Sequence, residues 1–385
     1  MESRVYIGGK GSKKTVYWNS HCLRKLCMKI IFLLDVFANT EVNRFLLEEV
    51  LFLRKQDIDA RVVTLLREDD SDTLYSESLF SKETFTCVPF VWWKGKDWKK
   101  LKTLIEKESP ALVITSGKKA DIVGNLVARH VRVPKIFVFA HDVNEIEKRN
   151  KTADNILASR TDFFIVSSEE AKKMLVAEGV FEGKIAVLRD GISFENYGVA
   201  SLHDVRYGLD IPKEEFVFVF LGDLTAERGV DVLLRAFAKV PRGFLLIVGD
   251  GSEKKSLEGL SQSLGLKARV KFIQNYFDIP GILVSSNAMV FPSKKEAFAV
   301  PVVLGLSSGL PVIAADFDGV SEIIENGENG LVVRKQDSEE LAKAMNTFLN
   351  DTELYVKLKG NTKKNLTKFS LSAHAAKLLA LVQKK

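Results

Sequence analysis

The feature that most constrains this chain is a repeated alternation, from Met28 onward, of short apolar runs and helical stretches. The apolar runs are continuous in Val, Ile, Leu and Phe, as expected for strands of a parallel sheet that is covered on both faces. Stretches with apolar residues at three- and four-residue spacing, such as 41–56, 118–130 and 169–179, lie between them. Strand–helix alternation at this period predicts right-handed crossovers and a doubly wound sheet.

The alternation occurs in two series, which a polar and irregular segment at 191–215 separates. The first series has predicted strands at 29–34, 61–66, 112–115, 135–139, 162–166 and 184–188, and the second at 216–221, 244–248, 269–273, 288–291, 311–314 and 330–333. We therefore expect an α/β protein with two Rossmann-like, doubly wound domains, at 28–190 and 216–368, joined by a linker. Ligands of open α/β sheets bind outside the carboxyl ends of the strands, so the expected site is a cleft between the domains.

Charge is concentrated in the first 27 residues. They hold six Lys and Arg against one acid, a balance of +5, whereas the other 358 residues hold 50 basic and 49 acidic groups. A nucleic-acid-binding protein would spread its basic excess over a folded face, so nucleic acid is not an expected partner. The same 27 residues lack the ~7–15-residue apolar stretch of a secretory signal. We predict a flexible N-terminal extension at 1–27.

Two further features concern the compartment. No apolar run approaches the ~20 residues that a membrane span needs. Three cysteines, Cys22, Cys27 and Cys87, are too few for a disulfide framework in 385 residues. We therefore predict a soluble cytoplasmic protein.

One turn in the second half suits a phosphate. The predicted strand 216–221 ends at Gly222, and the following turn contains Asp223 and Arg228 before a predicted helix at 230–239. Such a turn leaves unpaired backbone N–H groups at the positive end of a helix dipole. Arg228 would add a cation with forked donors. The alternative is an ordinary strand–helix turn with a solvated arginine.

A second turn places a carboxylate at the same kind of edge. Glu296 follows the predicted strand 288–291, and a carboxylate there is well suited to accept hydrogen bonds from sugar hydroxyls. Ala297 and Ala299, on either side of Phe298, would let backbone N–H groups approach a substrate. The alternative, which the spacing alone favours, is an acid that complements the dipole of the next helix.

His141 is the candidate in the first half, since it follows the predicted strand 135–139 at a carboxyl end. A lone histidine at such a position is more often structural than catalytic. The chain has no His, Cys and Asp cluster with zinc spacing and no Gly-x-Ser-x-Gly elbow. We therefore expect neither a metal ion nor another cofactor.

Residues 92–102 combine aromatic and basic side chains, beginning with Trp92 and Trp93 and ending with Lys102. A helix at 97–108, capped by Asp97, would place Trp98 on an apolar face with lysines beside it. Such a surface suits a peripheral membrane contact, which would place the protein at the inner face of the membrane. The alternative is a helix that packs on its own sheet while its lysines are solvated.

Several motifs of the second half resemble those of retaining glycosyltransferases with the GT-B fold, in particular the large family 4 of group 1 glycosyl transferases. These motifs are Phe-Pro-Ser-x-x-Glu-x-Phe at 291–298, Gly-Leu-Pro-Val-Ile-Ala at 309–314, Asp-Gly-Val-Ser-Glu-Ile-Ile at 318–324 and Asn-Gly-Glu-Asn-Gly-Leu-Val at 326–332. A weaker likeness at 28–30, 141, 166–169 and 190–192 extends the resemblance from Met28 to a C-terminal helix at 369–385, which in such folds crosses back to the first domain.

The resemblance implies transfer of a sugar, with retention, from a nucleotide-sugar donor on the second domain to an acceptor on the first. By position, Glu296 would hold sugar hydroxyls, Arg228 the diphosphate, and His141 the cleft near the transferred sugar. The donor-binding positions that it implies are Gly222, Asp223, Asn275, Tyr276, Ala297, Phe298, Ala299 and Leu304. The chemistry would be stabilisation of the departing diphosphate by cations and helix N-termini, with no metal required.

Some positions depart from the family pattern. Leu304 stands where the second glutamate of Glu-x7-Glu binds the donor's ribose, and Asp223 stands where the family has arginine. The acceptor loop at 38–43 has no glycine, Asp190 replaces an asparagine, and Ala299 replaces a glycine. Two functions stay open. One is a hexosyltransferase that builds a cell-envelope polysaccharide or glycolipid on a glycan or lipid-linked acceptor. The other is a catalytically degenerate GT-B protein that acts as a binding or partner subunit.

Overall fold

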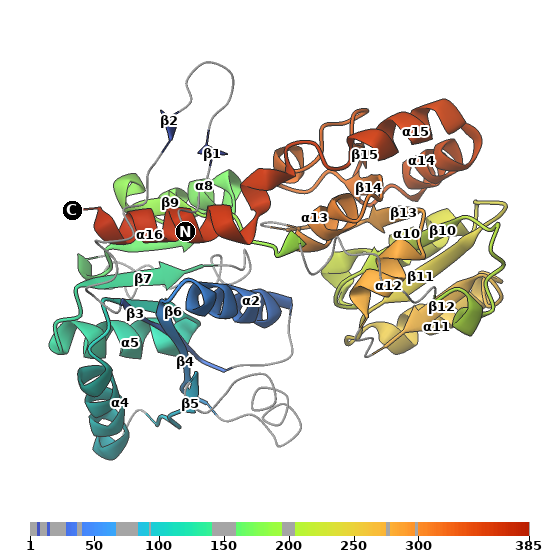
Figure 1. The fold of residues 1–385 in the computed structure, drawn as a ribbon. Helices are drawn as coiled ribbons and strands as arrows, with labels where there is room; N and C mark the ends of the chain where they lie inside the picture. Colours follow the sequence, from blue (N-terminus) through green and yellow to red (C-terminus); the bar gives the residue numbers. More distant parts are fainter. Residues whose placement is uncertain are drawn as a thin grey trace. The chain divides into compact units, whose positions relative to one another are not determined.

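The computed structural model describes residues 6–7, 14–15, 28–36, 41–66, 84–91, 94–140, 159–194, 205–274, 278–296 and 299–384, except for the side chains of 6–7, 14–15 and 41–45. Two parallel sheets with connecting helices account for most of them, and a two-stranded antiparallel ladder joins β1 (Tyr6–Ile7) to β2 (Lys14–Thr15) (Figure 1). None of the helices in these ranges is long and apolar enough to cross a bilayer.

The first sheet has seven strands in the order β5-β4-β3-β6-β7-β8-β9. Its strands are β3 (Lys29–Leu34), β4 (Asp59–Thr64), β5 (Phe85–Cys87), β6 (Leu112–Ser116), β7 (Lys135–Phe139), β8 (Phe163–Val166) and β9 (Ile185–Val187). The helices of this series are α2 (Glu41–Lys55), α4 (Gly95–Glu108), α5 (Lys118–His130) and α8 (Glu169–Ala177). The direction of strand addition reverses between β3 and β6, which makes the sheet doubly wound.

The second sheet has six strands in the order β12-β11-β10-β13-β14-β15. Its strands are β10 (Val217–Leu221), β11 (Phe244–Val248), β12 (Val270–Ile273), β13 (Ala288–Phe291), β14 (Val312–Ala315) and β15 (Gly330–Val333). The helices of this series are α10 (Val230–Phe237), α11 (Lys254–Ser263), α12 (Ile279–Val284), α13 (Val300–Ser307), α14 (Ser338–Asn350), α15 (Thr352–Asn361) and α16 (Leu371–Gln383). Here the reversal falls between β10 and β13.

The predicted fold class, with two Rossmann-like doubly wound α/β domains, is confirmed. The continuous apolar runs are buried as a covered parallel sheet requires: Ile30, Phe32 and Leu33 in β3 are 0% exposed, and so are Phe218 and Phe220 in β10. All the strand pairs described in both sheets are parallel.

Two local features differ from the prediction. The edge strand β5 was not predicted, because its three residues Phe-Thr-Cys are partly exposed and too few to form an apolar run. The prediction that Asp97 caps its helix was wrong: α4 begins at Gly95 with Lys94 as N-cap. The Asp97 carboxylate, 7% exposed, instead accepts a hydrogen bond from the Val91 N–H at 3.1 Å, so it fixes the segment that leads into the helix.

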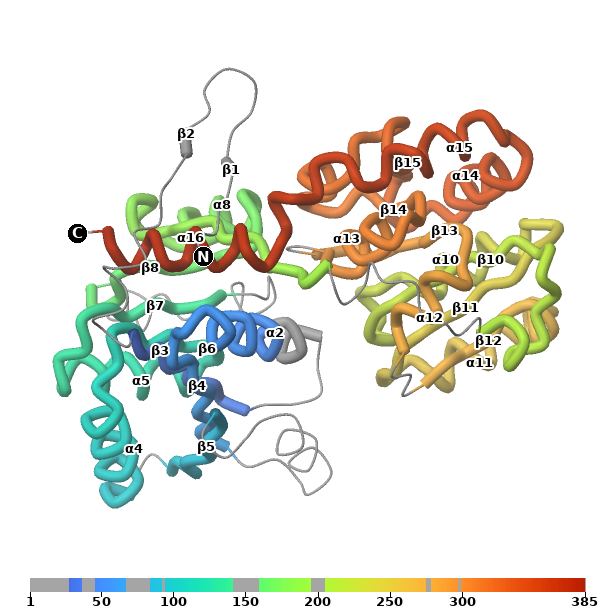
Figure 2. Tube along the Cα trace, in the orientation of Figure 1, coloured from blue at the N-terminus to red at the C-terminus, as the bar shows by residue number. Residues whose placement is uncertain are grey.

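The chain forms two compact units, Met1–Phe139 with Ile156–Phe163 and Ala140–Asn155 with Phe164–Lys385. Within the second unit, α16 lies beside the segment that follows β9 (Figure 2). Ile192 exchanges backbone hydrogen bonds with Phe369 and Leu371, and the ring Nδ1 of buried His374 lies 2.8 Å from the Arg189 carbonyl oxygen. The domain limits at 190, 215 and 368 remain predictions.

The Asp59 carboxylate in β4 allows a test of how charge stabilises the first sheet. Arg61 donates two hydrogen bonds to it at 3.0 Å each, and these hold the pKa of Asp59 below its ordinary value of 3.8. The stabilisation is therefore complete above that value and is lost as pH falls through the lowered pKa. Asp59→Asn should lower Tm by about 2–4 °C at neutral pH, with a deficit that shrinks below pH 3.8.

The measurement is thermal unfolding of the wild type and of Asp59→Asn, from neutral pH to below pH 3.8. Asp57→Asn, at an exposed position with a φ of +61°, is the control and should keep or raise Tm, because asparagine tolerates this backbone conformation. A deficit for Asp59→Asn that stays constant with pH contradicts the charge-based explanation.

Candidate functional site

The reversal point of the second sheet brings two predicted site turns to one edge. β10 and β13 are neighbours in parallel register, with Phe218 opposite Ala288 and Val219 opposite Met289. Parallel neighbours end at the same edge, so the turn after β10 and the turn after β13 lie next to each other (Figure 1). This is the position at which open α/β sheets bind ligands.

These two turns are in close contact along their backbones. The Lys294 N–H donates to the Glu227 carbonyl oxygen at 2.8 Å. Gly229 has a φ of +67°, and a Cβ there would lie 2.4 Å from the Pro292 carbonyl oxygen. Only glycine allows both this backbone conformation and this approach. The two turns therefore form one structure.

Arg228 and Glu296 meet in this structure as an ion pair. Arg228 ends the 3₁₀ turn η3 (Ala226–Arg228) and Glu296 lies between β13 and α13. The two side chains are 18% and 12% exposed, and the Ser293 hydroxyl donates to Glu296 Oε1 at 2.9 Å. A guanidinium and a carboxylate held together in a largely desolvated place form a strong, directional pair. Arg228 and Glu296 were separate candidates in the sequence, and in the structure they form one pair.

The predicted residues Gly222 and Asp223 lie in the same turn after β10. The Gly222 N–H donates to the Val248 carbonyl oxygen at 3.1 Å, so this turn is fixed to the end of β11. A Cβ at Gly249 would lie 1.9 Å from the Gly222 carbonyl oxygen, so the approach again requires glycine. The Asp223 side chain is exposed beside it.

A polar cluster lies at the ends of β11 and β12, and its residues were not among the predicted donor-binding positions. Gln274 donates to the Asp250 carboxylate, the Gly251 N–H donates to it at 2.9 Å, and Lys254 donates to Gln274. The hydrogen bond from Gln274, followed by that from Gly251, lowers the pKa of Asp250. The Gly-Asp-Gly turn at 249–251 was the available signal in the sequence, but the participation of Gln274 depends on the pairing of β11 with β12.

The other predicted site residues fall into two groups. His141, Asn275, Tyr276, Ala297 and Phe298 lie outside the described residues, as do Trp92 and Trp93 and the first part of the acceptor loop. Ala299 is 0% exposed and is the N-cap of α13, and Leu304 is 4% exposed within α13, a helix whose eight residues are all buried. The leucine at 304 thus belongs to the core.

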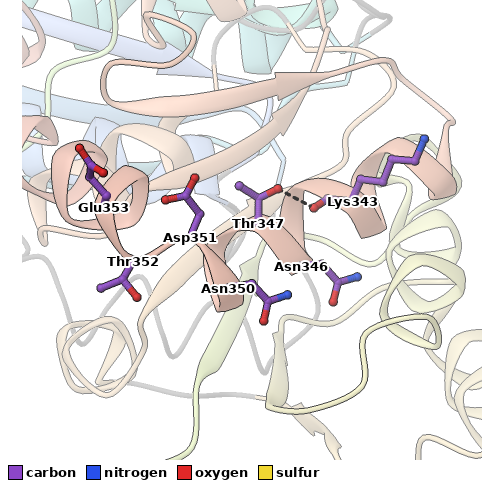
Figure 3. A pocket seen from close by; sticks show the side chains of 7 residues that line it. All are labelled: Lys343, Asn346, Thr347, Asn350, Asp351, Thr352 and Glu353. Atoms are coloured by element: carbon purple, nitrogen blue, oxygen red, sulfur yellow. Dashed lines mark hydrogen bonds between the residues drawn. The ribbon is translucent and has the colours of Figure 1, made fainter.

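A separate polar hollow of about 840 Å3 lies where α14 is followed by α15 (Figure 3). Its lining residues are Lys343, Asn346, Thr347, Asn350, Asp351, Thr352 and Glu353. The hydroxyl of the nearby Tyr355 donates to the carbonyl oxygen of Asn287, directly before β13, at 3.0 Å. The hollow is therefore close to the amino end of β13, whereas Arg228 and Glu296 lie at the carboxyl end.

No group of three or more His, Cys, Asp or Glu side chains within the described ranges is arranged to hold a metal ion. The expectation that the reaction needs no metal remains a prediction.

Comparison with known proteins finds similarity in the second half of the chain, where the family motifs lie. The sequence profile of the family Glycosyl transferases group 1 matches residues 204–365. Alpha-D-kanosaminyltransferase of Streptomyces kanamyceticus is 31% identical over 184 residues, 46% of this chain and 47% of that protein. D-inositol 3-phosphate glycosyltransferase of Mycobacterium marinum is 28% identical over 201 residues, 50% of this chain and 43% of that protein. Each match thus spans less than half of the relative's length.

Solved structures extend the likeness to both sheets. The crystal structure of Anabaena HepE in complex with UDP has a TM-score of 0.80 at 22% identity, covering 92% of this chain and 100% of that chain. The predicted GT-B fold is therefore confirmed. The family profile matches residues 204–365, the part of the chain that contains the motifs between 291 and 332.

The approach of Gly229 to Pro292 predicts a specific cost for a side chain. Gly229→Ala would place a methyl group against a carbonyl oxygen in a backbone conformation that alanine disfavours. We expect Tm to fall by about 4–8 °C, for a cost of about 2 kcal/mol. Gly259→Ala, in α11 with open space around its Cβ, is the control and should keep or raise Tm. Equal Tm values for the two variants would show that the two turns are not in close contact.

Proposed function

We propose that this chain is a retaining glycosyltransferase of the hexosyltransferase type, which transfers a sugar from a nucleotide-sugar donor. The observation that carries the proposal is the Arg228–Glu296 pair at the reversal point of the second sheet, inside the segment that matches the family. The geometry puts a cation and a carboxylate side by side where open α/β sheets bind ligands. A nucleotide sugar offers a partner for each, a diphosphate and a set of hydroxyls.

In the proposed reaction, Arg228 neutralises the diphosphate as its bond to the anomeric carbon breaks. A cation that is already in place stabilises the charge that develops on a leaving group without further reorganisation. Glu296 accepts hydrogen bonds from the sugar hydroxyls and so fixes the ring relative to the diphosphate. We include in the proposal that no metal ion is needed, because a guanidinium together with backbone N–H groups can supply the positive charge.

The relatives support this choice of donor. HepE has been crystallised with UDP and with UDP-glucose, and the two curated relatives are named as a kanosaminyltransferase and a glycosyltransferase. For the acceptor we propose a glycan or lipid-linked molecule of cell-envelope polysaccharide or glycolipid synthesis, on the basis of the family resemblance. Asp223 and Leu304 depart from the family pattern, but none of the relatives supports the alternative of a degenerate partner subunit.

Substitutions at the ion pair test the proposed chemistry. Glu296→Gln keeps the shape of the side chain but removes its charge, and Arg228→Met removes the cation. We expect each to lower kcat/KM for sugar transfer at least ~100-fold while the protein stays folded, since both groups act on the transition state. The assay is transfer and donor hydrolysis with a panel of nucleotide sugars, with circular dichroism as the check on folding.

Glu328→Gln is the matched control, because Glu328 is an acid of the same domain that pairs with Lys357 at an exposed position. It should leave kcat/KM unchanged. Turnover by Glu296→Gln at the wild-type rate would remove this residue from the mechanism. A wild-type protein that neither binds nor hydrolyses any nucleotide sugar would favour the partner-subunit alternative.

The structure also refines the proposed membrane contact. Trp98 packs edge-on against Phe90 at a centroid distance of 5.0 Å, and Leu101 and Ile105 are buried in the same core. The apolar face of α4 is therefore used in packing. Lys96, Lys99 and Lys100 are exposed on the helix, so we propose that a membrane contact there is electrostatic and directed at anionic lipid.

Charge reversal tests this contact. Lys99→Glu with Lys100→Glu should reduce co-sedimentation with phosphatidylserine-containing vesicles about tenfold or more, and binding of the wild type should fall as salt is added. The paired control Lys255→Glu with Lys267→Glu, at exposed positions of the second sheet's domain, should bind like the wild type. Equal binding by the two double variants, or no binding by the wild type, would argue against a membrane contact through α4.

A further inference from the structure

Ser293 is a buried hydroxyl residue at the centre of the two contacting turns. It is 0% exposed, and its Oγ lies 2.9 Å from Glu296 Oε1, 3.3 Å from the Glu227 carbonyl oxygen and 3.4 Å from the Lys295 carbonyl oxygen. A hydroxyl has one proton to donate. Of the three acceptors, the carboxylate is both the nearest and the charged one, so it makes the strongest hydrogen bond.

Ser293 and Arg228 hold the same carboxylate oxygen of Glu296 but differ in what else they can do. In the proposed function the Arg228 guanidinium also serves the incoming diphosphate, so its geometry at Glu296 changes when the donor binds. Ser293 is enclosed by protein and has no such second task. Its hydroxyl can hold the carboxylate in one orientation both before and after the donor arrives.

We propose that Ser293 is a positioning residue, whose hydroxyl orients the Glu296 carboxylate for the sugar. This inference rests on the proposed function. A carboxylate that keeps a buried donor is fixed in direction and favoured in its charged form. Without that donor, Glu296 would rotate more freely and would take up a proton at a higher pH. Both changes reduce the fraction of molecules in which the carboxylate faces the substrate correctly.

The test uses three substitutions at this position. Ser293→Ala removes the donor, Ser293→Cys fills the volume with a weak donor, and Ser293→Thr keeps the hydroxyl. We expect Ala and Cys to lower kcat about tenfold, with a smaller change in the donor KM, and to move the acid limb of the pH–rate profile to higher pH. Thr should restore the wild-type acid limb and most of kcat, although its extra methyl group lowers Tm.

Ser286→Ala is the matched control. Ser286 is 7% exposed at the amino end of β13, and its hydroxyl donates to the Ile282 carbonyl oxygen at 2.8 Å. The Ser286→Ala variant should keep the wild-type kcat and the wild-type acid limb, even if its Tm changes. Wild-type kinetics in both Ser293→Ala and Ser293→Cys would overturn the proposal, and so would the same acid-limb shift in Ser286→Ala.

A second measurement separates this inference from the proposed function. If the wild type transfers no sugar, the proposed function fails, and thermal unfolding still reports on the Ser293–Glu296 contact. In a double-mutant cycle, Ser293→Ala with Glu296→Gln should lose clearly less Tm than the sum of the two single losses. Strictly additive losses would show that the hydroxyl does not hold the carboxylate, and would overturn the inference on their own. If Ser293→Ala does not fold, Ser293→Cys takes its place in the cycle.

Discussion

The parallel pairing of β10 with β13 is the constraint on which the candidate site depends. Two residue pairs, Phe218 with Ala288 and Val219 with Met289, set the register, so both strands end at one edge. The side chains along the two strands are apolar, all of them except Leu221 are buried, and polar groups occur only beyond the strand ends. The buried strands therefore fix where the two turns begin. The turns themselves then bring the side chains of Arg228 and Glu296 together.

Within the site, the positive charge of Arg228 is balanced by the carboxylate of Glu296. Asp223 and Asp250 add negative charge on the turns beside this pair. A diphosphate would thus meet one guanidinium that already has a carboxylate partner. A carboxylate in the position of Asp223 repels a nearby phosphate at ~4–6 Å, where the family has an attracting arginine. Backbone N–H groups and the redirection of Arg228 must then supply most of the attraction.

The sequence was sufficient for the layers of the fold, because each strand interior is a continuous apolar run. The limits predicted at 29–34, 135–139, 244–248, 288–291 and 330–333 agree with the structure. It was insufficient at β5, whose three residues are too few to form an apolar run, and at Asp97, where one polar contact decides the role of the side chain. The contact of Arg228 with Glu296 could not be predicted from the sequence either. These residues are 68 positions apart, and they meet only because β11 and β12 are added on one side of β10 and β13 on the other.

Leu304 shows how a departure from the family pattern can be read physically. All eight residues of α13 are buried, so a glutamate at 304 would need a polar partner to offset the cost of removing its charge from water. Leucine removes that need and adds apolar packing, at the loss of a ribose contact that the family resemblance implies. Glu296 lies between β13 and α13, where Arg228 and the Ser293 hydroxyl both pair with its carboxylate. In this chain, donor recognition would therefore depend more on the β10–β13 edge than on α13.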